Sequence, residues 1–301
     1  MSRAIAILSA LLLLPGLSYA QSPQSLRNAH WVFSRNMLSF NSGSGLPTAD
    51  TLPTTGHACI SDTAGHLLGY LARNLSNQWG VFDSSGAELP GFPSDLTLSS
   101  GGYPPAAFIP KPGNPDSTHL LFIGRPTGTA DSNAGLLTMR LSSAGVQPAG
   151  IHPAIHWFSS NVGVCQFAVP AADGEGYWLV VQPGGTAAFH AHRLDADGIS
   201  PLPVISSAGP VRGPAVKYGH MVANLAGDRF VASYRHGSHA SDTMRIELFS
   251  FDAGSGTVSH TATLPSRRPE GIAFSPSGRF LYVLEHYIIP PLSGVRLTLV
   301  Q

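Results

Sequence analysis

Short apolar runs, each entered through a turn, recur along the chain at an interval of about fifty to sixty residues. The runs begin at His66, His119, Tyr177, Arg229 and Arg279. A second glycine turn follows each of the first four runs with the same period. These glycines are Gly86, Gly145, Gly198 and Gly256. Two turn signatures that share one period indicate a repeated structural unit.

Each unit predicts four short strands. Glu270–Ser275 is typical of an innermost strand, Phe280–Leu284 of a second strand, and Ile246–Phe251 of a third strand that ends in the glycine turn. Four strands in about fifty residues are typical of a β-propeller blade, whereas solenoid repeats are shorter or helical. No long stretch keeps a 3.6-residue apolar period, so helices should be scarce. We therefore predict an all-β propeller of four-stranded blades, with at least five units visible.

The two ends of the repeat pattern leave the number of blades open. The fifth unit stops at Gly294–Val300, its third strand, so we expect the last blade to be incomplete. At the other end, His30–Phe33 and Met37–Phe40 predict two extra strands before the first unit. These strands could complete the last blade and close a small ring. The alternative, which we favour, is a truncated chain that lacks one or two blades.

The N-terminus has the pattern of a secretory signal peptide. A short basic start ending at Arg3 is followed by an apolar stretch, Ala4–Leu14, and by the small residues Ser18 and Ala20 at the expected cleavage site. Residues 1–20 are therefore predicted to be the signal peptide and residues 21–301 a single propeller domain. No later segment is apolar for long enough to span a bilayer. We expect an exported protein in the periplasm, on the outer cell surface or outside the cell.

Composition narrows the class of partner. The 17 basic and 17 acidic side chains balance, which removes the electrostatic attraction that drives nucleic-acid binding. Hydrophobic residues make up 43% of the chain and charged residues 11%, a balance that excludes intrinsic disorder. We expect a monomer that binds carbohydrate or protein. Whether Cys59 and Cys165 form a disulfide or remain buried thiols stays open.

The same stretches resemble a family of exported propellers with YVTN- or WD40-like repeats that is common in Bacteroidetes. The family often forms the N-terminal part of surface and gliding-associated proteins. The resemblance covers residues 30 to about 285. Its clearest stretches are Ala58–Asp62, Gly65–Tyr70, Val81–Gly86, Phe108–Gly113, Ile246–Asp252 and Gly271–Gly278. It implies the fold and the export route rather than an activity.

Propeller geometry suggests where a ligand could bind. Loops that leave the second strands converge around one mouth of the central channel, so polar residues there would form a binding rim. The predicted ligand-binding residues are Arg73, Arg125, Gln182, Arg235, His236, Glu285 and His286. Residues at the starts of the innermost strands could hold a divalent metal ion. These are His57, His220 and Glu270.

No motif for nucleotide binding, zinc proteolysis or a serine nucleophile is present in the sequence. The leading hypothesis is therefore a non-enzymatic binding module with its ligand at the channel mouth. One alternative is a lactonase- or esterase-like hydrolase in which a rim metal polarises an ester carbonyl. Another is a structural segment of a larger adhesin or motility protein. The sequence leaves the ligand, any cofactor and any catalytic activity open, and an enzyme is the less favoured case.

Overall fold

The computed structural model describes most of the chain beyond the predicted signal peptide. The described residues are 30–39, 48–62, 64–73, 78–90, 92–93, 97–98, 106–114, 116–126, 132–142, 145–148, 155–211, 219–235, 244–266, 269–275, 277–289 and 292–300. The chain divides into two compact units. The first comprises Met1–Pro90 with Ser142–Gln147, and the second comprises Gly91–Leu141 with Pro148–Gln301. No helix in the described stretches is long and apolar enough to cross a membrane.

The first unit contains one antiparallel sheet, sheet A. Its strands, in spatial order, are β1 (His30–Ser39), β2 (Thr48–Ser61), β3 (Leu67–Arg73) and β4 (Trp79–Phe82). The two strands expected at the N-terminus form one strand, β1, which pairs with β2. The ring of Tyr70 stacks on that of Phe82 at 5.6 Å, and Cys59 packs beside them. The extra strand is therefore part of the first blade.

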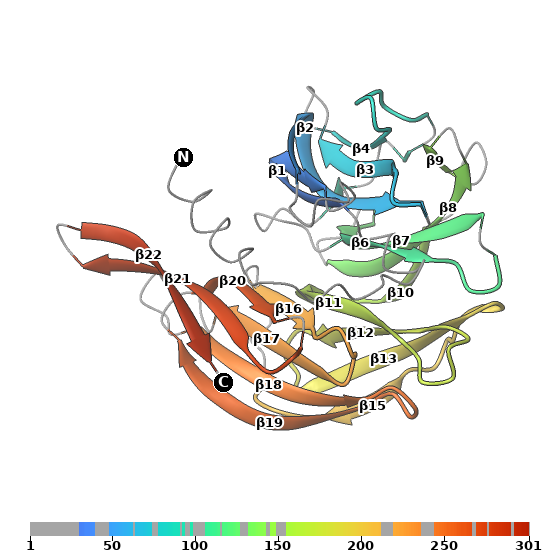
Figure 1. Ribbon diagram of the computed structural model, residues 1–301. Helices are drawn as coiled ribbons and strands as arrows, with labels where there is room; N and C mark the ends of the chain where they lie inside the picture. Colours follow the sequence, from blue (N-terminus) through green and yellow to red (C-terminus); the bar gives the residue numbers. More distant parts are fainter. Residues whose placement is uncertain are drawn as a thin grey trace. The chain divides into compact units, whose positions relative to one another are not determined.

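The second unit contains four antiparallel sheets, named B to E along the chain (Figure 1). Sheet B holds β5 (Thr97–Leu98), β6 (Ala106–Pro110), β7 (Ser117–Arg125), β8 (Asn133–Ser142) and β10 (Ile155–Ser159), and the short β9 (Gly145–Pro148) follows β8 in the chain. Sheet C holds β11 (Val162–Pro170), β12 (Tyr177–Pro183), β13 (Ala188–Asp195), β14 (Gly198–Ile199) and β15 (Val204–Ser207).

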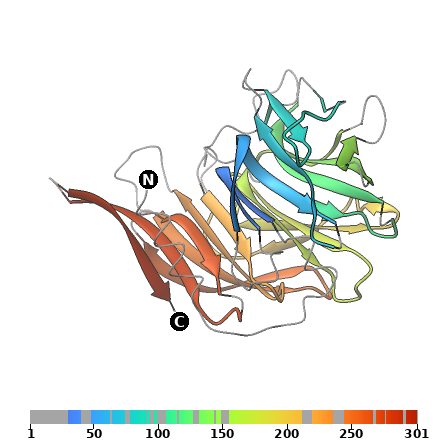
Figure 2. The same cartoon turned by 45° about the horizontal axis from the view of Figure 1, so that its top comes forward.

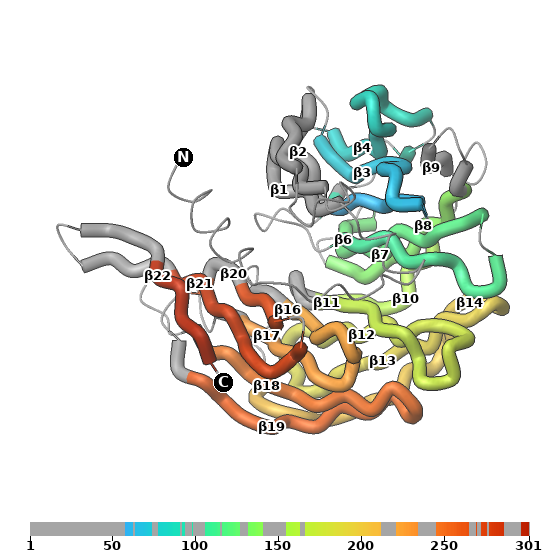
Figure 3. The backbone as a smooth tube through the Cα atoms, in the orientation of Figure 1, coloured from blue at the N-terminus to red at the C-terminus, as the bar shows by residue number. Residues whose placement is uncertain are grey.

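Sheets D and E repeat the same meander with fewer strands. Sheet D holds β16 (Gly219–Ala223), β17 (Arg229–Arg235), β18 (Met244–Asp252) and β19 (Thr257–Ser266). Sheet E holds β20 (Pro269–Phe274), β21 (Leu281–Ile289) and β22 (Leu292–Val300). The strands of sheet D are paired in chain order from β16 to β19, and Figure 3 shows β18 and β19 as neighbouring tubes.

The sheets of the second unit are arranged as propeller blades. Their innermost strands β6, β11, β16 and β20 contact one another in chain order, and Figures 1 and 2 show β11, β16 and β20 side by side. The predicted all-β propeller of small antiparallel blades is confirmed. The last blade has three strands, as the repeat pattern predicted.

Both faces of a central blade are buried, which explains its nearly continuous apolar runs. In β12, Leu179 packs toward sheet B, whereas Trp178 and Val180 pack toward sheet D. Successive residues of a strand point to opposite faces, so an unbroken apolar run fills two cores at once. The predicted glycine turns are also necessary. Gly256 has φ 77°, and a Cβ atom there would lie 2.7 Å from the Trp178 ring.

Candidate functional site

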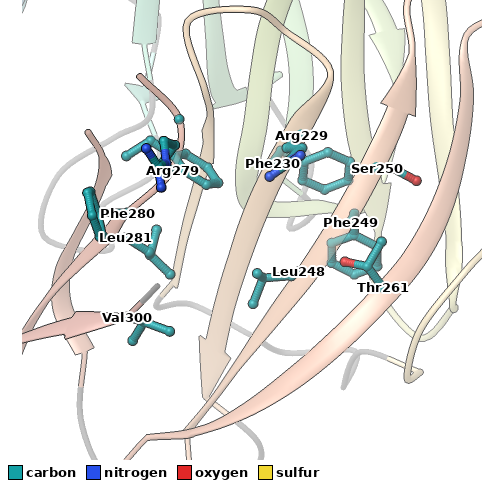
Figure 4. A pocket seen from close by; sticks show the side chains of 12 residues that line it. Arg229, Phe230, Leu248, Phe249, Ser250, Thr261, Arg279, Phe280, Leu281 and Val300 are labelled. Atoms are coloured by element: carbon teal, nitrogen blue, oxygen red, sulfur yellow. The ribbon is translucent and has the colours of Figure 1, made fainter. Parts of the chain in front are cut away.

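A pocket of about 360 Å³ opens between sheets D and E of the second unit (Figure 4). Its lining combines apolar side chains with two arginines and two hydroxyl groups. The lining residues are Arg229, Phe230, Leu248, Phe249, Ser250, Thr261, Phe274, Gly278, Arg279, Phe280, Leu281 and Val300. Ligand pockets in proteins commonly span about 300–1,000 Å³. This pocket is therefore large enough for a small ligand or for one or two side chains of a partner.

The two arginines come from different positions in their repeats. In sheet D the tight turn closes with a hydrogen bond from Asn224 N to the Arg229 carbonyl oxygen, at 2.9 Å. In sheet E the matching bond runs from Ser275 N to the Phe280 carbonyl oxygen, at 2.8 Å. Arg229 is thus the structural counterpart of Phe280, and Arg279 lies one residue earlier in its own turn.

This offset makes both arginines face the same gap. A shift of one residue reverses the face to which an extended residue points. Val231, two residues after Arg229, and Leu281, two residues after Arg279, belong to one buried cluster between sheets D and E. Arg229 therefore points forward to sheet E and Arg279 points back to sheet D. Figure 4 shows the nitrogen atoms of both side chains at one end of the pocket, with Leu248 and Val300 toward the other end.

The two turns that carry the arginines are held close together. Asn224 is 9% exposed, donates from Nδ2 to Asp228 Oδ1 at 2.7 Å, and accepts the Arg229 backbone N–H at 3.2 Å. Gly278, with φ 68°, approaches so closely that a Cβ atom there would lie 3.0 Å from Asn224 Nδ2. The arginine end of the pocket is therefore built on packed turns.

The rest of the lining is mainly apolar and aromatic. The rings of Phe230 and Phe249 stack at 4.7 Å and are almost fully buried, while Leu248 and Val300 are half-buried. Thr261 is the extra residue of a β-bulge in β19, which adds an exposed hydroxyl group to the lining. Bulges commonly redirect a side chain in this way.

The two arginines carry unbalanced positive charge. The ion pairs between described residues join His66 to Asp62, Arg193 to Asp173, His260 to Glu247 and Arg296 to Glu285. None of these pairs includes Arg229 or Arg279, both of which are exposed, and no carboxylate lines the pocket. The Asp228 carboxylate next to Arg229 is bonded to Asn224 instead. The charged end of the pocket therefore has no anion from the described part of the chain.

Four residues of the predicted channel rim have described side chains. In the first unit, Arg73 lies over the Trp79 ring, 4.7 Å from its centroid. In the second unit, Arg125 is exposed at the end of β7. Gln182 is fully buried, and its Nε2 donates to the Thr186 carbonyl oxygen at 3.5 Å. Glu285 is 7% exposed and accepts a 2.7 Å bond from Arg296 Nη2.

The remaining predicted site residues have no described side chains. His236 lies outside the described residues, and the same applies to the side chains of Arg235, His286, His57, His220 and Glu270. Within the described part of the chain, no three His, Cys, Asp or Glu side chains come together as metal ligands. The rim and its metal site remain predictions.

A second group of polar side chains lies between sheets B and C. His119 follows the same β7 face as Leu121, which packs against Leu179 and Leu194 of sheet C. On the sheet C side, His192 lies opposite Leu179 in the register of β12 and β13. The His192 ring meets Phe158 of β10 edge-on at 5.0 Å. These histidines are therefore part of a packed interface between two blades.

Burial keeps these histidines neutral at neutral pH. Burial, with the Lys111 charge as a smaller cause, lowers the pKa of His119 to about 4. Burial also lowers the pKa of His190 and of His192, and the nearby His190 and His156 lower that of His192 further, against the effect of its bond to the Ser200 carbonyl oxygen. The Nε2 atoms of His119 and His192 have no hydrogen-bond partner among the residues that the structure describes.

The pocket between sheets D and E was not among the predicted sites. The sequence carries a signal for it, because Arg-Phe follows the glycine turn in only the last two repeats, as Arg229-Phe230 and Arg279-Phe280. Aligning the repeats on this dipeptide gives both arginines the same position. Counting from the turn glycines instead would have separated them, since Arg229 is two residues after Gly227 and Arg279 is one after Gly278.

No protein-family model and no curated protein matches the chain, so the YVTN- or WD40-like assignment remains a resemblance. Several solved structures are similar in shape. The endo-arabinase of Bacteroides thetaiotaomicron VPI-5482 shares 12% identity over 90% of this chain and 95% of its own, with a TM-score of 0.45. The hydrazine synthase of Kuenenia stuttgartiensis shares 13% over 86% and 71%, with a TM-score of 0.42. A thermostable family-43 glycoside hydrolase shares 13% over 81% and 88%, with a TM-score of 0.39. None of these activities is carried over to this chain.

Proposed function

We propose that the protein is an exported binding module that holds its ligand in the pocket between sheets D and E. The observation that carries the proposal is the lining itself, which combines apolar side chains with two arginines that have no carboxylate partner among the described residues. Exposed apolar surface inside a concavity gains free energy when a ligand removes it from water. The predicted signal peptide supports export.

The lining favours a protein or other partly apolar partner over a carbohydrate. A sugar would leave most of its hydroxyl groups against Leu248, Leu281 and Val300, where they would lose water without gaining partners. Away from the arginine end, only the Ser250 and Thr261 hydroxyl groups offer hydrogen bonds in return. An apolar group would instead fill the same space without an unsatisfied polar atom.

The proposal is tested by blocking the pocket in the mature chain, residues 21–301. The neutral apolar dye N-phenyl-1-naphthylamine should bind saturably, with a rise in fluorescence. Val300→Trp places an indole in the pocket and should weaken binding at least tenfold. Leu299→Trp is the matched control, because Leu299 is the preceding residue of β22, 56% exposed and on the opposite face.

Circular dichroism and the urea midpoint of each variant establish that it is folded. Saturable binding that Val300→Trp removes and Leu299→Trp keeps supports the proposal. Absence of saturable binding to the native protein, or equal binding by both variants, overturns it.

A further inference from the structure

We infer that the ligand of the pocket between sheets D and E carries a carboxylate joined directly to an apolar body. This inference rests on the proposed function and names the class of ligand. Arg229 and Arg279 reach one end of the pocket from two adjacent turns, and the apolar side chains occupy the remainder (Figure 4). The pocket thus has a charged end and an apolar end, and such a ligand has a charged end and an apolar end as well.

The charged end is suited to a planar anion. A guanidinium group stays charged at every physiological pH and presents paired N–H donors that match the two oxygens of a carboxylate. Two like charges at one end of a pocket repel each other, and a bound anion would remove that repulsion. Neither arginine meets an acidic side chain that already does so within the described residues.

The apolar part selects against anions that lack a hydrophobic portion. Inorganic phosphate would contact the arginines and leave the half-buried Leu248, Phe280 and Val300 in contact with water. An aromatic or branched aliphatic group would cover them and meet the half-buried rings of Phe274 and Phe280. Aromatic side chains favour such edge or offset ring contacts. Charge and apolar contact are therefore both needed for full occupancy.

Two sources share this chemistry. One is a free small acid, and the other is the C-terminal carboxylate of a peptide whose last side chain is apolar. In a peptide the last side chain and its carboxylate are attached to the same Cα atom, so both can enter a pocket of about 360 Å³ together. The test below has one arm for each source.

The decisive comparison uses 3-phenylpropionate and 3-phenylpropionamide, which have the same shape but differ in charge. Binding to the mature chain is followed by ligand-observed NMR, because a Kd on the order of 1 mM is expected for a ligand of this size. The acid should bind at least tenfold more tightly than the amide. Added salt should weaken binding of the acid and leave that of the amide unchanged.

The variants assign the preference to the two arginines. The double variant R229Q/R279Q should bind acid and amide equally, with the amide bound as in the native protein. Arg140→Gln is the matched control, since Arg140 is an exposed arginine of sheet B outside the pocket, and it should keep the preference. The amide also reports folding of the pocket, so a double variant that binds the amide normally has lost only the charge recognition.

The outcomes separate the inference from the function beneath it. If the native protein binds the neutral dye in the pocket but prefers the amide or shows no preference, the carboxylate inference is wrong and the binding function stands. If the double variant keeps its preference for the acid, the inference is also wrong. If no probe binds, the proposed function fails first. The peptide source is supported if N-acetyl-Gly-Gly-Phe binds more tightly than 3-phenylpropionate and if the C-terminal amide of the peptide loses this binding. The small acid is supported if the peptide binds more weakly than 3-phenylpropionate.

Discussion

Sheets B and C meet around two buried histidines, whereas sheets D and E meet beside two exposed arginines. His119 and His192 are 5% and 3% exposed and lie among leucines, with His156 and His190 nearby. Arg229 and Arg279 are exposed, and the sheets on either side of them leave a pocket. Both interfaces belong to the same unit and are built from the same repeated strands.

The difference follows from what each side chain can do when it is desolvated. An imidazole can release its proton and enter an apolar interface as a neutral ring, at the cost of a lowered pKa. A guanidinium group cannot lose its charge, and burying it without an anion would cost several kcal/mol. Two blades can therefore close over histidines but stay open beside arginines.

The sharpest way to test this comparison is the same truncation in both interfaces. Leu179→Ala removes a fully buried side chain from the sealed interface and should lower the free energy of unfolding by about 2–5 kcal/mol. Leu248→Ala removes a half-buried side chain that already borders a cavity, so its loss should be under about 1 kcal/mol. Urea unfolding of both variants measures the difference. Equal losses would mean that the D–E interface is packed as tightly as the B–C interface.

The second test uses acid. His119 has a pKa of about 4 in the folded chain against 6.5 in its unfolded form, so the unfolded state binds the extra proton first as the pH falls. The contribution of this group to the free energy of unfolding is fully present above about pH 6.5. It is lost as the pH falls from there to about pH 4, by at most about 3 kcal/mol. The Lys111 charge lowers the pKa of His119 in the same direction, and His190 and His156 act in this direction on the neighbouring His192.

His119→Gln should flatten this part of the pH profile, as measured by urea midpoints from pH 7 to pH 4. The variant keeps a polar atom within reach of Thr138, which lies 3.1 Å from His119 Nδ1 in the native chain. An unchanged slope in the variant would show that the acid sensitivity arises elsewhere in the molecule.

Most of the blade architecture could be predicted from the sequence because it depends on local chemistry. The run Tyr177–Val181 is apolar throughout, and Gly198 and Gly256 take the positive φ values that their turns require. These features act within a few residues, so a pattern of apolar runs and glycines is enough to predict them. The single strand β1 was harder to predict. The sequence indicated two strands, His30–Phe33 and Met37–Phe40, and the pairing of β1 with β2 depends on the residues between them.

The site could not be predicted in the same way, because it depends on contacts between blades. Gln182 and Glu285 follow second strands and were predicted to line a wet rim, yet both side chains are buried. Both residues lie inside strands that run further than the sequence pattern predicted, β12 (Tyr177–Pro183) and β21 (Leu281–Ile289), and how far a strand continues depends on the strands that pair with it. The pocket depends on a one-residue offset between two turns, and that offset is visible only when Gly227 and Gly278 are used as the reference points.

The smallest effect should come from the arginines themselves. In the double variant R229Q/R279Q the free energy of unfolding should stay within about 0.5 kcal/mol of the native value, because both side chains are exposed and make no ion pair with described residues. We expect the free energy of unfolding to rise slightly, since the substitutions relieve repulsion between like charges in the folded chain. This rise should become smaller with added salt. Urea unfolding at low and high salt measures both. A loss above about 1 kcal/mol would mean that the arginines hold sheets D and E together, and it would reverse the view that they keep the interface open for an anion.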